Sequence, residues 1–318
     1  MAAPTLSSPA GRARPHRPAP SRGRSRGTGR APWEHETPPL VAALKAVIIV
    51  GISLTMVYPL VYIVMMSFAA PSQAHSGTIL PTAFSLDAYR AIFRGDAVLQ
   101  GLGNSLWLTV VGTSLSMVFT TTMAWGLTRT RDVPGARLVL LLALGTMLFN
   151  AGMIPHYLLI RSLGLLDSSW SLVLPGLISA FNMVVVRNFF MGLPRDLLDS
   201  ARIDGAGEWR IFLTIALPLS KPVLAVMSLF YAVGCWNMYF NAMLYLNDAS
   251  KWPIQVVLQQ YVLAGVPLPG AVAAAEAPPP ALSLNMAIIV VATVPILVAY
   301  PFIQKYFRSG VLTGAIKG

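Results

Sequence analysis

Five residues at positions 236 to 241 combine aromatic rings with side-chain amides inside a long apolar run. Trp236, Tyr239 and Phe240 supply the rings, while Asn237 and Asn241 supply amides four positions apart, which is about one helical turn. Amides pair with hydroxyl groups, and aromatic faces pack against sugar rings. The pattern indicates either a carbohydrate contact surface or interhelical hydrogen bonds to a partner subunit.

Two more asparagines, Asn150 and Asn182, lie in other apolar runs and allow the same two interpretations. An unpaired amide in hydrocarbon is costly, so such side chains tend to face the protein interior. The candidate substrate-pathway residues are therefore Trp236, Asn237, Asn241, Asn150 and Asn182.

Enzymatic and metal-binding patterns are missing from the sequence. A phosphate-binding loop ends in Gly-Lys-Ser/Thr, but none of the five lysines follows a glycine. The four histidines show no i, i+4 pairing, and the Gly-x-Ser-x-Gly match at 23–27 lies in the Arg-rich tail, without the strand and helix patterns that flank a nucleophile elbow. Cys235 is the single cysteine, which excludes an intramolecular disulfide and a cysteine-based metal cluster. We predict no catalytic residue, no metal and no cofactor for this chain.

A polar stretch between two apolar runs has the pattern of an interrupted helix. Pro194 suits the first turn of a helix, and Gly205 suits the positive φ at which helices often end. The pattern restarts at Glu208 and runs to Leu217, after which Pro218 and Pro222 break it. We predict a helix-turn-helix elbow at 194–218, within a longer loop at 191–222.

Composition places this elbow in a membrane protein. The chain has 318 residues, of which 55% are hydrophobic and only 11% are charged, with a mean hydropathy of +0.63. That is too apolar for a soluble domain of this length. We predict an all-α membrane protein with six transmembrane helices. The spans are expected near 42–68, 103–127, 137–160, 170–190, 223–247 and 282–304, each long enough to cross the hydrocarbon core.

The positions of the basic residues orient these spans. With the N-terminus inside, 19 Lys and Arg fall in inside segments and four in outside segments, and 12 inside remain without the seven Arg of the tail. Basic residues are enriched on the cytosolic side of membranes. We therefore expect both termini, and the elbow between helices 4 and 5, in the cytosol. The net charge of +11 follows membrane sidedness, so we predict no nucleic-acid partner.

The elbow resembles the "EAA" loop of the permease subunits of ABC importers. That pattern is Glu-Ala-Ala, three residues, Gly, nine residues, Ile, one residue, Leu-Pro. Here Ala201, Gly205, Ile215 and Leu217-Pro218 keep the spacing, and Asp-Ser-Ala at 199–201 replaces Glu-Ala-Ala. The resemblance implies ATPase-coupling roles for Asp199, Ser200, Ala201, Asp204, Gly205, Ala206, Ile215, Leu217 and Pro218. Small Ala201 and Gly205 would permit close approach to the ATPase cleft.

Further resemblance concerns the C-terminal run from Pro301 to Gly318, which is similar to the tail of the second permease in maltose and oligosaccharide importers. Together with Asn104-Ser-Leu and the segment from Phe149 to Pro155, it looks like the lipo-oligosaccharide or aldouronate subgroup. The resemblance covers 42–318. It implies a permease subunit for a carbohydrate, an oligosaccharide in particular, in the bacterial inner membrane. The implied partners are a homologous second permease, two cytosolic ATPase subunits that bind ATP, and an extracytoplasmic solute-binding protein.

Two other classes compete with this interpretation. A stand-alone secondary transporter commonly carries ionisable residues at mid-membrane and internal repeats. The predicted spans have no central Asp or Glu, and no repeat is evident. An ABC drug exporter would lack the elbow motif and ranks lowest.

The N-terminal segment 1–39 is rich in Arg, Pro, Ser and Gly and lacks large apolar residues before Trp33. We predict a disordered cytosolic tail ahead of a permease domain at 40–318. The tail either touches anionic lipid headgroups or has no function. It resembles an organelle transit peptide in composition, but lacks the periodic apolar residues of an amphipathic helix.

Removal of 1–36 is expected to leave transport nearly unchanged, because a disordered tail makes few packed contacts. Uptake measured at matched membrane abundance checks this. A large loss of uptake by the truncated chain would contradict it.

Overall fold

The computed structural model describes residues 38–70, 81–130, 133–149, 151–263 and 281–315. Within these ranges the chain is helical and contains no strand, apart from one isolated bridge between Ala69 and Phe84. The predicted tail at 1–39 falls almost entirely outside the described residues, as does Asn150. The helices and helical turns are α1 Pro39–Ser67, α2 Asp87–Arg94, α3 Asp96–Gly126, η1 Leu127–Arg129, α4 Ala136–Leu148, α5 Met153–Ser162, α6 Trp170–Val173, η2 Leu174–Gly176, α7 Ala180–Met191, α8 Arg195–Ile203, α9 Glu208–Ile211, η3 Phe212–Ala216, α10 Leu217–Leu219, α11 Lys221–Trp236, α12 Phe240–Tyr245, η4 Ala249–Lys251, α13 Ile254–Leu258, η5 Gln259–Leu263 and α14 Ala281–Ala315.

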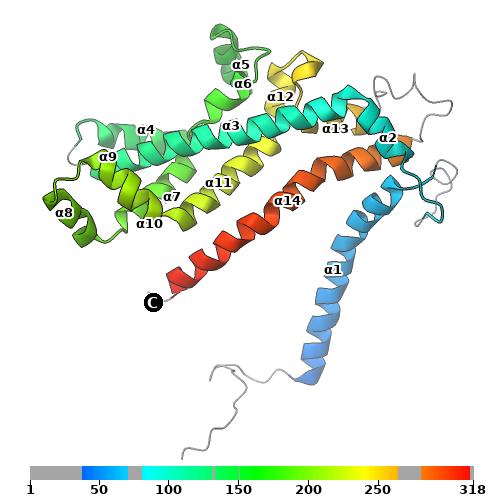
Figure 1. The fold of residues 1–318 in the computed structure, drawn as a ribbon, viewed down its shortest axis with the longest axis horizontal. Coiled ribbons are helices and arrows are strands. Elements are labelled where there is room, and N and C mark those ends of the chain that lie inside the picture. The colour runs from blue at the N-terminus through cyan, green and yellow to red at the C-terminus, as the bar shows by residue number, and fades with distance from the viewer. Residues whose placement is uncertain (1–37, 71–80, 131–132, 150, 264–280, 316–318) are drawn as a thin grey trace, which may run out of the picture. The chain divides into compact units, whose positions relative to one another are not determined.

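The chain divides into two compact units, Met1–Thr55 and Met56–Gly318, with the boundary inside α1. In the first unit the described residues belong to the apolar helix α1, where Thr55 donates a hydrogen bond to the Gly51 carbonyl at 2.9 Å. The second unit contains all the other helices. Its long helix α3 packs along α11 and α7 (Figure 1).

Three of the described helical segments are long and apolar enough to cross a membrane: Pro39–Ser67, Asp96–Arg129 and Ala281–Val298. The number rises to five if two bent pairs, α6–η2 with α7 and the 208–219 segment with α11, each count as one span. The first, second and last predicted spans match single helices. The last helix continues to Ala315, well past the predicted end at 304.

Three predicted spans are not single continuous helices, and one of them, 170–190, bends by 45° between η2 and α7. The predicted span at 137–160 is interrupted between α4 and α5, where Gly152 has a φ of 83° that ordinary helical residues do not adopt. The predicted span at 223–247 stops at Trp236. There the side-chain amide of Asn237 donates to the Val233 carbonyl at 3.0 Å, which helps to cap the end of α11 before α12 begins.

The short helix α2 begins at Asp87, two residues after Ser85. Leu86 occupies the cap position, and Ser85 instead accepts the Asp87 N–H at 3.0 Å and donates to the Asp87 carboxylate at 2.6 Å. The hydroxyl thus forms a local turn that precedes the helix.

A buried polar contact at the centre of the second unit joins three helices. The Tyr231 hydroxyl on α11 pairs with the Thr120 hydroxyl on α3 at 2.6 Å and accepts the Ser179 N–H at 2.9 Å. Ser179 is the N-cap of α7 and accepts the Asn182 N–H. The contact therefore fixes the bend of 45° between η2 and α7, which the sequence did not reveal.

Candidate functional site

The segment at 194–218 contains two helices separated by a glycine turn. Pro194 lies at the N-cap of α8, and α8 ends at Ile203. Gly205 has a φ of 79°, and the N–H groups of Gly205 and Ala206 return to the carbonyls of Arg202 and Ala201 at 3.0 and 2.9 Å. This pair of bonds is a Schellman ending, which requires a left-handed residue and explains the glycine.

The second helix begins at Glu208, as the sequence predicted, but its predicted end was wrong. Pro218 does not stop it, because the backbone stays helical through α10 to Leu219. A π-helical turn, η3, precedes the proline and accommodates its missing N–H. The break falls at Ser220, where the chain turns by 83° into α11.

One face of this elbow packs against the chain itself. Ala201, Ala206, Ile215 and Leu217 lie against a buried cluster that includes Trp125, Phe190 and Phe212 from α3, α7 and η3. The Trp125 ring meets Phe190 at 5.6 Å and Phe212 at 5.8 Å between centroids. Four of the predicted coupling residues therefore pack the elbow against the rest of the chain.

The other face is open. Asp199, Ser200, Asp204, Gly205 and Pro218 are exposed, and a Cβ atom added to Gly205 would meet no atom within 4 Å. Ile203 beside them is 87% exposed, although it is a large apolar residue. A cavity of about 210 Å³ beside α8 is lined by residues such as Trp125, Arg129, Arg195 and Asp199. The open face offers backbone, apolar and charged groups to another molecule.

A charged network fixes the start of the second helix. The Glu208 carboxylate pairs with Arg129 at the end of η1 and with Nε of Arg202 at 3.3 Å. Arg202 also pairs with Asp199 at 2.5 Å, and the Arg129 guanidinium lies 5.6 Å from the centre of the Trp125 ring. Glu208 occupies the first turn of α9, where a negative charge interacts favourably with the positive end of the helix dipole.

These contacts set the ionisation of Glu208. Partial burial raises the pKa of its carboxyl, but hydrogen bonds and charges from Arg129 and then Arg202 outweigh burial and lower the pKa below its ordinary value. The carboxylate is thus ionised at neutral pH. Neither Arg129 nor Glu208 was among the predicted site residues, although an acidic residue that opens a helix just after Gly207 was an available signal.

A separate cavity of about 360 Å³ lies between α5, α6 with η2, and α12. Its polar lining comes from His156, Ser171, Asn241 and Tyr245, and Phe240 adds an aromatic ring. Tyr245 also stacks on Tyr157 at 6.3 Å between ring centroids. Volumes of this size and mixed linings of this kind are typical of small-molecule sites.

The predicted substrate-pathway residues do not share this cavity. Asn241 lines it, whereas Trp236 is buried in a different cluster with Ile254 and Ile288. Asn237 pairs with its own helix and accepts a hydrogen bond from Gln255 at 3.4 Å. The two amides expected on one helical face are separated because α11 ends at Trp236 and α12 begins only at Phe240.

Of the five candidate substrate-pathway residues, two remain, and the structure describes only one of them. Asn182 is buried at the start of α7 and lies outside the cavity lining, and Asn150 is outside the described residues. His156, Ser171 and Tyr245 were not predicted, because they lie on three separate helices and share no spacing pattern. In the described residues no group of three His, Cys, Asp or Glu side chains could hold a metal ion.

Comparison with known protein families matches residues 40–313 to one model, the binding-protein-dependent transport system inner membrane component. The chain belongs to this family. The permease is 47% identical to the polygalacturonan/rhamnogalacturonan transport system permease protein YtcP of Bacillus subtilis (strain 168), over 84% of the chain and 94% of that protein. It is 46% identical to Protein LplC of the same organism, over 84% of the chain and 92% of that protein.

Solved structures agree with this family. The permease matches a chain of a bacterial ABC transporter involved in the import of the acidic polysaccharide alginate, with a TM-score of 0.82 and 31% identity, over 87% of the permease and all of that chain. A second alginate transporter chain, in a complex with a pentasaccharide-bound periplasmic protein, has a TM-score of 0.56 at 15% identity and shows a shared fold. The permease is therefore an inner-membrane transport component of a non-catalytic family, and the stand-alone transporter is not favoured.

Proposed function

We propose that this permease is one of two permease subunits in an ATP-driven importer for an oligosaccharide. In this assembly it pairs with a homologous permease, two ATPase subunits and an extracytoplasmic binding protein, and ATP is hydrolysed only on the ATPase chains. The observation that carries the proposal is the match to YtcP along 94% of that protein. The names of YtcP and of the alginate transporter both refer to polysaccharides with acidic sugars, which favours a uronate-containing oligosaccharide.

The proposed topology retains six crossings with both termini in the cytosol. The crossings are α1, α3, α4 with α5, α6 with α7, α11 with α12, and α14. Three of them are interrupted helices, which membranes tolerate where the freed backbone groups are buried in protein or line a cavity. The asymmetry of Lys and Arg supports this orientation, and it leaves the elbow on the cytosolic side.

Within this assembly the elbow at 194–218 is proposed to transmit ATPase motion. Its inner face is tied to η1 by the pair of Glu208 with Arg129 and to α3 by the cluster around Trp125. Its outer face, with Gly205 and Ile203, has no covering group from the described part of the chain. A segment that is rigidly held on one side and open on the other suits a coupling arm.

Purified permease reconstituted with its partners in proteoliposomes tests the function directly. Uptake of labelled oligogalacturonate should require ATP and the binding protein, and neutral oligosaccharides should compete poorly. Uptake that persists without ATP in an ion gradient would contradict the proposal.

Asn241→Ala is expected to lower uptake about fivefold with little change in the melting temperature of the complex. The reason is loss of one hydrogen bond to substrate in the 360 Å³ cavity, worth about 1 kcal/mol. Asn237→Ala is the matched control, because its amide bonds to Val233 and Gln255 and lies outside that cavity. Loss of the Asn237 amide should destabilise the permease itself by about 0.6 kcal/mol and leave uptake per complex unchanged. Equal uptake by the Asn241→Ala and Asn237→Ala variants would contradict the proposal that the cavity lies in the sugar pathway.

A further inference from the structure

Asp167 occupies a strained position in the link between α5 and α6. Its φ is 59°, and it is the one non-glycine residue with a positive φ in the described part of the chain. Such a conformation costs energy for a residue with a Cβ and persists only where the surroundings impose it. The contacts of Asp167 show what imposes it.

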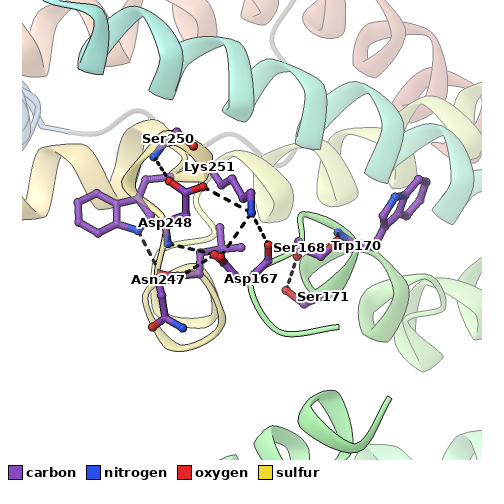
Figure 2. Close-up of polar contacts among 10 residues, drawn as sticks. Asp167, Ser168, Trp170, Ser171, Asn247, Asp248, Ser250 and Lys251 are labelled. Atoms are coloured by element: carbon purple, nitrogen blue, oxygen red, sulfur yellow. Dashed lines mark hydrogen bonds and ion pairs between the residues drawn. The ribbon is translucent and has the colours of Figure 1, made fainter. Parts of the chain in front are cut away.

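Both the backbone and the side chain of Asp167 bind the segment that follows α12 (Figure 2). Its N–H donates to the Tyr245 carbonyl at 2.8 Å, and its Oδ1 accepts the N–H groups of Asn247 and Asp248 at 3.1 and 3.0 Å. The Lys251 ammonium donates to the Asp167 carbonyl at 2.8 Å and lies 3.4 Å from its Oδ2. Asp167 therefore makes five contacts with four groups on residues 245–251.

The same segment is fixed from the opposite side by α3. The Asn104 amide donates to the carbonyls of Ser250 and Trp252 at 2.8 and 3.1 Å. The Ser105 hydroxyl accepts the Ile254 N–H at 2.8 Å. Residues 245–254 thus lie between α3 and the link that carries Asp167, and each side is held by hydrogen bonds.

The position of Asp167 relates these bonds to the 360 Å³ cavity. His156 on α5 and Ser171 on α6 line that cavity on either side of Asp167 in the chain. Asn241 and Tyr245 line it from α12, and Tyr245 is the residue whose carbonyl accepts the Asp167 N–H. Asp167 itself is not in the lining. Its bonds therefore join the walls of the cavity without contact with its contents.

We propose that Asp167 is a positioning residue that holds the α12 wall of the substrate cavity against α5 and α6. It acts on the sugar through Asn241 and Tyr245. The inference rests on the proposed function of the cavity in the oligosaccharide pathway.

The charge state of Asp167 agrees with this role. The N–H of Asp248 lowers the pKa of the carboxyl, and Lys251 and Asn247 act in the same direction against a smaller effect of burial. The group is a carboxylate at neutral pH. It can then accept from both amides and pair with Lys251 at once.

Three substitutions separate the side chain of Asp167 from its backbone conformation. Asp167→Asn keeps an oxygen acceptor and tolerates a positive φ, Asp167→Gly keeps the φ but loses the acceptor, and Asp167→Ala loses both. We expect Asn to retain most uptake, and Gly and Ala to lower it about tenfold, because the hydrogen bonds to the carboxylate are lost. Asp248→Ala is the matched control: its carboxylate pairs with Ser250 and Lys251 inside its own loop, so uptake should stay near wild type.

A labelling measurement tests the geometry apart from transport. In a Cys235→Ala background, Leu244→Cys places a single thiol in the cavity lining of the intact complex. A hydrophilic maleimide should react with it about tenfold faster when Asp167→Gly or Asp167→Ala is added, and at an unchanged rate with Asp167→Asn or Asp248→Ala.

The outcomes distinguish the two proposals. Unchanged labelling in Asp167→Ala, or recovery of both labelling and uptake by Asp167→Gly, would overturn the positioning role. Faster labelling with normal uptake would support the positioning role and contradict the proposed function of the cavity.

Discussion

Gly205→Asp is expected to abolish sugar uptake while the permease remains inserted and as abundant as wild type. A Cβ atom added at this position meets no atom within 4 Å, so an aspartate side chain can leave the backbone there without a clash at its first carbon. The φ of 79° costs a non-glycine residue about 1–2 kcal/mol, which is too little to unfold the protein. The loss would therefore come from bulk and charge on the face proposed to meet the ATPase.

Gly207→Asp is the matched control for this variant. Gly207 lies two residues away in the same turn, has a φ of −68° and is also open around its Cβ. Because Gly207 is the N-cap of α9, an aspartate there can accept a hydrogen bond from the first turn and stabilise the helix. Uptake and co-purification of the ATPase should be nearly normal for Gly207→Asp. Normal uptake by Gly205→Asp, or equal losses in both variants, would contradict a specific docking role.

Glu208→Arg should produce the second largest loss, because it breaks the ion pair between the elbow and Arg129 of η1. It places three guanidinium groups together where Arg129 and Arg202 now share one carboxylate. Simple loss of such a partly exposed pair costs about 1 kcal/mol, or roughly a fivefold change in population, and repulsion adds to this. ATP hydrolysis should continue, while uptake per ATP falls.

The charge-swapped double variant Arg129→Glu with Glu208→Arg provides the control. It restores opposite charges at the same positions and should recover part of the uptake ratio. Failure of the swap to recover anything would show that the residues act independently. The lowered pKa of Glu208 also predicts that this tie is present throughout neutral pH and is lost only as pH falls through that lowered value.

Two local signals in the sequence predicted features of the 194–218 segment. Gly205 marks its turn and Glu208 marks its second start, because backbone conformation and helix capping depend on neighbouring residues. Pro218 misled the prediction, since a π-helical turn before it lets the helix continue. The small size of Ala201 has a reason in the chain's own packing as well, so Ala201→Arg would disturb the elbow from within and is a weaker test than Gly205→Asp.

The cavity was harder to predict for a physical reason. His156, Ser171 and Asn241 come from three helices, and their meeting depends on two breaks that apolar runs conceal, one at Gly152 and one at Asn237. Hydropathy identifies which residues can lie in a membrane, but it does not reveal where an interrupted helix changes direction. The spacing of Asn237 and Asn241 therefore suggested one polar face where the structure has two separate sites.

Site-specific cross-linking from Ile203 tests the coupling role of the elbow most directly. Ile203 is 87% exposed at the end of α8, next to Gly205. A photoreactive residue at this position, in the complete complex in lipid, should cross-link to the ATPase subunit, with a yield that changes between ATP-bound and nucleotide-free states. Cross-links to lipid or to the binding protein, with none to the ATPase in either state, would contradict the proposed coupling role.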